Sequence, residues 1–155
     1  MPDETTEIRS LLAPVENGHM LLPGSIVAEV VPLADLRAIK DAPEWVMGEL
    51  DWQDWRVPIV SFAMLAGTTE QEKPGSNHRV LVIKSLAVQA GTPYVGIMIS
   101  GVPRLSNVTA AALTEPDSRS DHPCVFREVS FEDRRVLIPE LDELMTLVEP
   151  VMADA

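Results

Sequence analysis

Short hydrophobic runs separated by turn-forming residues fill most of the chain, and this pattern is typical of a protein built from short β-strands. The runs that predict strands are 8–15, 20–22, 27–31, 48–52, 55–62, 78–86, 94–102, 124–131 and 135–141. Asn17-Gly18 is a strong hairpin signal, and Gln53-Asp54 and Glu132–Arg134 mark the tips of two further hairpins. Pro58 lies inside one run, where we expect a sheet edge or a bulge. These signals predict an all-β fold of about nine or ten strands, arranged as small barrels or a sandwich.

Helical signals are few. Residues 34–45 form a connection with room for one helical turn, and 63–67 reads as a helical turn closed by Gly67. A C-terminal helix is predicted from apolar residues at helical spacing, which are Leu141, Leu144, Met145 and Val148. We expect this helix to end before Pro150.

Polar stretches divide the chain. Residues 68–77 carry Pro74-Gly75 and are the best candidate linker, so we expect them to separate the strands into two sets. A second polar loop is expected at 114–123 and a turn at 89–93. The ends, 1–7 and 149–155, are expected to be loose.

Charge narrows the functional classes. The net charge is −12 and the isoelectric point is near 4.5, which disfavours binding to nucleic acid or to an anionic membrane surface. The single cysteine excludes an internal disulfide and fits a reducing cytosol. No signal peptide and no apolar run of membrane-spanning length is visible. We therefore expect a cytoplasmic protein without direct membrane insertion.

Candidate catalytic and metal-binding chemistry is sparse. His19, His78 and His122 lie far apart, and His122 with Cys124 makes only half of a metal-ligand set. Cys124 begins an apolar run, which favours a small buried residue over a nucleophile. Ser61 lies in a strand run without the turn that presents a nucleophilic serine, and no phosphate-binding glycine loop occurs. We expect no catalytic residue, no cofactor and no metal.

Trp52 and Trp55 are the most unusual feature. They flank Gln53-Asp54, so they should face each other across the predicted hairpin. Both core packing and partner contact fit two large rings at this place, and the sequence leaves these alternatives open. Glu49 and Asp51 precede them on one face of the strand, where we interpret them as part of a solvated arm. An enzyme acting on carbohydrate through Glu49, Asp51 and Trp52 is the alternative.

The order of these elements resembles the CheW-like coupling domains of bacterial chemosensory arrays. The family's V-x-E-I strand is matched by Val27–Val30, and its P-x-x-I-x-G segment by Pro43, Val46 and Gly48. The hairpin arm I-P-V-V-D-L corresponds to Val57–Phe62. Two later matches complete the frame: Val95–Val102 for V-G-L-x-V-D-x-V, and the C-terminal hairpin followed by Leu137, Ile138, Leu141, Leu144 and Met145.

The resemblance implies a single domain over 8–148 with two small SH3-like five-stranded β-barrel lobes and a short C-terminal helix. The approximate lobes are 8–67 and 78–141, and strand exchange between them is allowed. It also implies a non-enzymatic adaptor that links the cytoplasmic tip of a chemoreceptor to the regulatory domain of a CheA-type histidine kinase. Such an adaptor is recruited to membrane-associated arrays.

Departures from the family pattern point to a divergent member. Gln53 and Asp54 stand where the family usually has Arg-Gly at the hairpin tip, and Ser61 and Ser100 replace two aspartates. The chain looks more like the accessory adaptors of type IV pilus systems, which control twitching motility, than like the flagellar one. The residues expected to contact partners are Val27, Glu29, Gly48, Trp52, Gln53 and Asp54.

Overall fold

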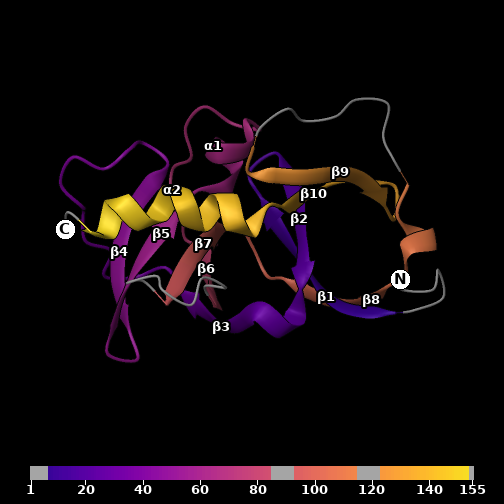
Figure 1. The fold of residues 1–155 in the computed structure, drawn as a ribbon, viewed down its shortest axis with the longest axis horizontal. Coiled ribbons are helices and arrows are strands. Elements are labelled where there is room, and N and C mark those ends of the chain that lie inside the picture. The colour runs from indigo at the N-terminus through magenta and orange to yellow at the C-terminus, as the bar shows by residue number, and fades with distance from the viewer. Residues whose placement is uncertain (1–6, 85–92, 115–122, 154–155) are drawn as a thin grey trace.

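In the computed structural model of the chain, which describes residues 7–84, 93–114 and 123–153, the strands form two five-stranded sheets (Figure 1). The strands are β1 (Ile8–Val15), β2 (Gly18–Pro23), β3 (Val27–Pro32), β4 (Val46–Trp52), β5 (Trp55–Val60), β6 (Arg79–Lys84), β7 (Tyr94–Ile99), β8 (Arg104–Val108), β9 (Val125–Phe131) and β10 (Arg134–Pro139). The helices are η1 (Gly24–Ile26), α1 (Phe62–Ala66), η2 (Ala110–Ala112) and α2 (Leu141–Ala153). Most of the predicted turn at 89–93 and of the predicted loop at 114–123 lies outside the described residues, as do 1–6. The mainly-β prediction is confirmed.

Each sheet contains strands from both the N-terminal and the C-terminal half of the chain. Lobe 1, on the right in Figure 1, has the strand order β8-β1-β2-β10-β9, and lobe 2, on the left, has the order β3-β6-β7-β5-β4. The sheets therefore do not follow the contiguous lobes 8–67 and 78–141. The segment 68–77 does not separate them either, because β1 and β2 pair with β8 and β10 from the other half of the chain. The strands are exchanged between the two halves, and lobe 1 contains both the first strand, β1, and the last strand, β10.

Three apolar clusters fill the part of the molecule that the structure describes. One lies inside lobe 1 around Leu12 and Val136, and another lies inside lobe 2 around Val57 and Met98. The third joins the lobes and includes residues of α1 and α2, among them the fully buried Phe62. Central strands are consequently buried on both faces, which explains why they read as continuous apolar runs.

The predicted hairpins are confirmed, with tight turns in the left-handed region. In the β4–β5 turn the φ angles of Gln53 and Asp54 are 49° and 67°, and Asn17 in the β1–β2 turn has 62°. Among residues other than glycine, asparagine and aspartate tolerate this region best, so Asn17 and Asp54 suit a two-residue connection. Pro58 differs from its prediction, because β5 lies inside the sheet order. It is accommodated there because β5 pairs with β7 only at Ile59 and Val60.

The helices α1 and α2 are short, and a few apolar residues of each pack against the core that joins the lobes. Ser61 caps α1 by accepting a hydrogen bond from the Met64 N–H, and Gly67 ends this helix with a φ of 79°, as predicted. Helix α2 runs across the front of lobe 2 in Figure 1 and buries Leu144 and Val148. The prediction that it ends before Pro150 is wrong, since α2 continues to Ala153. The loose end predicted for 149–155 is correspondingly helical through 153. None of the helices among the described residues is long and apolar enough to span a bilayer.

Candidate partner-binding site

The expected contact residues lie on two elements of lobe 2, the β3 strand and the β4–β5 hairpin. The indole Nε1–H of Trp52 donates a hydrogen bond to Glu29 Oε2 at 2.9 Å, so the two elements are joined. The β3–β6 pairing shifts register between Val27 and Glu29. Such a bulge re-aims the side chain that follows it, and bulges are common beside functional sites.

A third aromatic ring completes the hairpin tip. Trp52 and Trp55 are direct cross-strand partners, and each contacts Tyr94 of β7, with ring centroids 4.7 Å and 6.1 Å from the Tyr94 centroid respectively. Trp52 is partly buried against the lobe 2 core, whereas 47% of Trp55 is exposed. The two tryptophans therefore differ: Trp52 anchors the hairpin on the core, and Trp55 presents its ring to solvent.

Gln53 and Asp54 are exposed at the tip, and within the described residues neither side chain has a hydrogen-bond or ion-pair partner. Val27 is half-buried against the core that joins the lobes. Gly48 is buried, with a φ of 140°, and a Cβ there would lie 2.5 Å from the Arg37 carbonyl oxygen. Its place in the fold is therefore to let two backbones approach, and direct contact with a partner does not fit its burial.

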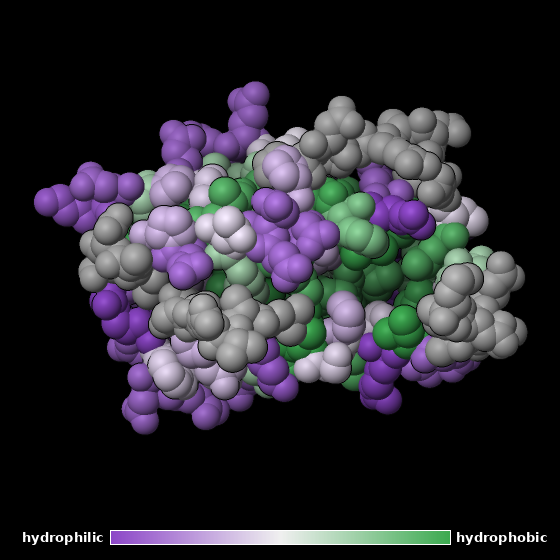
Figure 2. All heavy atoms as spheres, in the orientation of Figure 1, coloured by the Kyte–Doolittle hydropathy of each residue, from purple (hydrophilic) through white to green (hydrophobic). Residues whose placement is uncertain are grey.

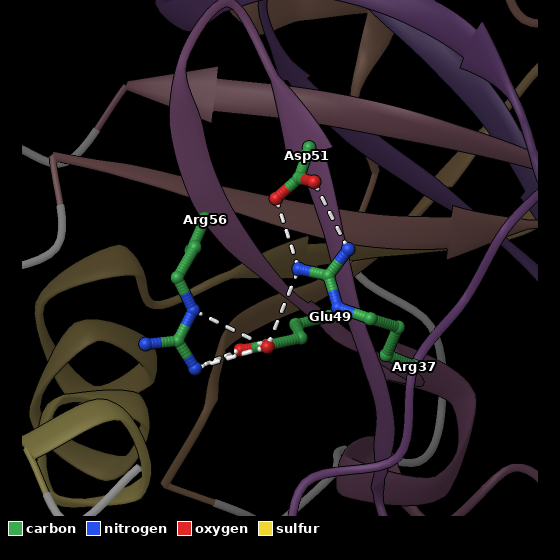
Figure 3. Close-up of polar contacts among 4 residues, drawn as sticks. All are labelled: Arg37, Glu49, Asp51 and Arg56. Atoms are coloured by element: carbon green, nitrogen blue, oxygen red, sulfur yellow. Dashed lines mark hydrogen bonds and ion pairs between the residues drawn. The ribbon is translucent and has the colours of Figure 1, made fainter.

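A four-residue charge cluster holds the base of the hairpin (Figure 3). The Arg37 guanidinium donates to both carboxylate oxygens of Asp51, at 2.9 Å and 3.0 Å, and reaches Glu49 Oε1 at 3.4 Å. Arg56 donates to Glu49 through Nε and Nη2 at 2.8–3.2 Å. The Arg37 hydrogen bonds hold the pKa of Asp51 below its ordinary value.

Glu49 was expected on a solvated arm, and this expectation is wrong. Only 8% of its side chain is exposed, because the two arginines close over it. A carboxylate buried this deeply is stable only when it is paired and hydrogen-bonded. An acid catalyst for carbohydrate requires a carboxyl with a raised pKa, and the lowered pKa of Asp51 is the opposite. The cluster therefore has the chemistry of a structural clamp.

Ser61 belongs to a second buried polar group, which the sequence did not predict. Its hydroxyl donates to Glu72 Oε1 at 2.5 Å, and His78 Nε2 lies 3.3 Å from Glu72 Oε2. Glu72 stands between the serine and the histidine, whereas a serine nucleophile needs the histidine beside it. The group instead fixes the 68–77 segment, predicted as a linker, onto the end of β5.

Cys124 is buried, as predicted, and burial raises the pKa of its thiol to about 11. A thiol with a raised pKa is a poor nucleophile. His19 lies in β2, where burial and nearby Arg134 and Arg104 lower its pKa, and His122 lies outside the described residues. Among the residues that the structure describes, no three His, Cys, Asp or Glu side chains gather as a metal site.

Two features of the site have no clear signal in the sequence. Tyr94 is the chain's single tyrosine, and it meets the hairpin because β5 and β7 are parallel neighbours. Arg37 comes from the connection between β3 and β4, where its backbone pairs with Glu49. Both contacts join segments far apart in sequence, so local patterns do not reveal them.

Comparison with known proteins agrees with this architecture. The model of the CheW-like domain family matches residues 9–149. The crystal structure of the scaffolding protein TtCheW from Thermoanaerobacter tengcongensis has a similar fold, with a TM-score of 0.71 and 16% sequence identity over 88% of this chain and 86% of that chain. The search of curated proteins gave no match. Because the family model spans nearly all of the chain, the protein belongs to the CheW-like domain family.

Proposed function

We propose that the protein is a non-enzymatic adaptor that couples chemoreceptors to a CheA-type histidine kinase. The observation that carries the proposal is the family match over residues 9–149, together with a fold shared with a scaffolding protein. The charge clamp and the buried Cys124 support a scaffold, because their chemistry favours holding structure over reaction. The place of action is the cytoplasm, at receptor arrays on the membrane.

The receptor-facing surface is proposed to lie on lobe 2. It comprises the exposed residues Glu29, Gln53 and Asp54 with Trp52 and the half-buried Val27. The Glu29–Trp52 hydrogen bond supports this grouping, because it places β3 and the hairpin tip on one surface. Gly48 supports this surface indirectly, because its lack of a side chain lets the 34–45 connection pack closely against β4.

The kinase contact is proposed to lie on lobe 1, where apolar residues gather on the face displayed in Figure 2. Phe126 is 65% exposed and Leu105 is 52% exposed. A cavity of about 210 Å³ lies in the same lobe, with Ile8, Leu21 and Val108 in its apolar lining. Exposed apolar surface of this kind marks interaction sites. The contact should be modest in size and partly apolar, with the net charge affecting association rate more than strength.

A role in a type IV pilus system is the finer part of the proposal. Its support is the set of departures from the flagellar pattern, above all Gln53 and Asp54 at the hairpin tip and Ser61 at the start of α1. Such an adaptor retains the fold but selects different partners. Deletion in the source cell should then impair twitching while leaving flagellar swimming intact.

Binding assays with purified components test the adaptor function. The full chain is titrated with the regulatory domains of the CheA-type kinases and with the cytoplasmic fragments of the receptors from the same cell. We expect binding to at least one of each. Phe126→Ser should weaken only the kinase complex, and Gln53→Ala should weaken only the receptor complex. Failure of the wild-type chain to bind any kinase domain or receptor fragment would overturn the proposal.

A further inference from the structure

The tip of the β4–β5 hairpin carries uncompensated negative charge. Arg37 and Arg56 are engaged by Glu49 and Asp51 at the base of the hairpin. Within the described residues, Glu29 accepts its bond from a neutral indole, and Asp54 has no partner. Residues 85–92, which precede Tyr94 in sequence, carry no charged side chain. Among the residues that the structure describes, the two carboxylates of the tip therefore have no paired cation.

The same tip carries an aromatic cluster. Trp52 meets Tyr94 edge to face with an interplanar angle of 67°, and Trp55 tilts against Tyr94 at 55°. Lys84 faces Tyr94 across the β6–β7 pair, but its Nζ lies 3.5 Å from the Ser25 carbonyl oxygen. Nearly half of Trp55 remains exposed. An aromatic face beside carboxylates attracts a cation through both the ring quadrupole and direct charge.

We propose that this tip surface, formed by Trp52, Trp55, Tyr94, Glu29 and Asp54, binds an arginine side chain of the partner protein. A guanidinium fits better than an ammonium because it stacks on an aromatic face and offers several donors to carboxylates. The family pattern has a cation at this tip, so the proposal reverses the charge that the partner must present there. The inference rests on the proposed adaptor function only for the identity of that partner.

The indole N–H groups provide a direct readout by NMR. Trp52 and Trp55 belong to the tip surface, while Trp45 packs against the core that joins the lobes and serves as an internal control. The probe is the peptide acetyl-Ala-Arg-Ala-amide, with the citrulline peptide as its neutral isostere. We expect the arginine peptide to shift the Trp52 and Trp55 indole signals more than the Trp45 signal, and the citrulline peptide to have a much smaller effect. Equal responses to the two peptides would overturn the proposal.

A second hairpin offers a matched control for charge. The β9–β10 turn in lobe 1 has Glu132 and Asp133 at φ angles of 53° and 62°, the same backbone as the tip. Asp54→Asn should weaken binding of the arginine peptide about two- to fivefold, the range expected for one exposed charge or cation–π contact. Asp133→Asn should leave it unchanged. Equal losses from the two substitutions would mean general attraction to an acidic chain and would refute a specific site.

The receptor assay separates this inference from the adaptor function. If receptor fragments bind and Asp54→Asn weakens them while Asp133→Asn does not, both stand. If they bind with equal affinity to wild type and Asp54→Asn, the arginine site fails and the adaptor function stands. If no fragment binds but the peptide shifts the tip indoles as expected, the adaptor function fails and the arginine site stands.

Discussion

Arg37 and Glu49 are joined through both backbone and side chain. The N–H of each donates to the carbonyl oxygen of the other, at 2.8 Å and 2.7 Å, and the Arg37 guanidinium lies 3.4 Å from the Glu49 carboxylate. This pairing extends the open edge of β4 by a short bridge from the preceding connection. The proposed receptor surface is therefore supported from below by the clamp.

Removing the Arg37 guanidinium should weaken this support. Arg37→Met leaves the buried Glu49 with Arg56 alone, and we expect the free energy of unfolding to fall. Lys40→Met, on the exposed part of the same connection, should change it by less than about 0.5 kcal/mol. Urea denaturation measures both. Equal stability of the two variants would show that the clamp contributes nothing.

Gly48 should not tolerate a side chain. An alanine Cβ would meet the Arg37 carbonyl oxygen at 2.5 Å, on a backbone whose φ of 140° disfavours any L-residue. We expect Gly48→Ala to destabilise the fold by about 2 kcal/mol or more. Gly18→Ala is the control, since its Cβ would meet only Val15 at 3.9 Å. Thermal unfolding of both variants checks this, and a Gly48→Ala protein as stable as wild type would contradict the structure.

The Trp52–Glu29 hydrogen bond can be tested by a double-mutant cycle. Trp52→Phe keeps an aromatic ring against Tyr94 but removes the indole donor, and we expect a cost of about 0.5–1.5 kcal/mol. In a Glu29→Ala background the same change should cost less, because the acceptor is already absent. Trp55→Phe, which removes an indole with no such bond, should show no coupling to Glu29. An additive cycle for Trp52 would mean that the bond does not form in solution.

Cys124 should react slowly with thiol reagents in the folded protein. Its pKa is raised from 9.0 to about 11, so at a given pH below 9 the thiolate fraction is on the order of a hundredfold smaller than in the unfolded chain. As pH rises, the thiol of the unfolded chain loses its proton before the thiol of the folded protein does. The free energy of unfolding should therefore fall as pH rises from 9.0 towards 11. Alkylation rates at about pH 8, with and without denaturant, measure the difference in thiol reactivity. In Cys124→Ala the free energy of unfolding should fall less between pH 9 and 11 than in the wild type. Equal alkylation rates would refute the burial.

Exchanging the hairpin tip should change partner choice. The pair Gln53→Arg and Asp54→Gly restores the family pattern, and glycine suits the φ of 67° at position 54, so the fold should not suffer. We expect the double variant to gain affinity for flagellar-type receptor fragments and to lose it for its own, with each exposed contact contributing about 0.2–1 kcal/mol. Binding at two salt concentrations is the measurement. Unchanged affinities for both receptor types would exclude a role for the tip in selection.

Local features of the fold could be read from the sequence. The hairpins at Asn17-Gly18 and Gln53-Asp54 and the Gly67 helix end depend on residues within a few positions of one another, so their turn chemistry was visible. The short β8 strand was missed because its residues Arg104–Val108 are mostly exposed and lack an apolar run. Pro150 predicts a helix end, whereas α2 continues beyond it to Ala153.

The candidate site was only partly predictable. The family resemblance named Glu29 and Trp52, but nothing local indicated that one accepts a hydrogen bond from the other. The burial of Glu49 and Glu72 was missed because a carboxylate reads as solvated until its partners are known, and those partners lie on other elements. Tyr94 joined the tryptophans only through the parallel pairing of β5 and β7.

The exchange of strands between the two halves of the chain has a consequence for biosynthesis. Lobe 1 needs β9 and β10, which are synthesised after every other strand of the two sheets, to complete a sheet that β1 and β2 begin. Pairings between distant segments carry a large loop-closure entropy and slow the folding of β proteins. The apolar faces of β1 and β2 therefore remain without β10 until that strand has been synthesised, and a nascent chain stalled before β9 exposes the surface on which aggregation begins.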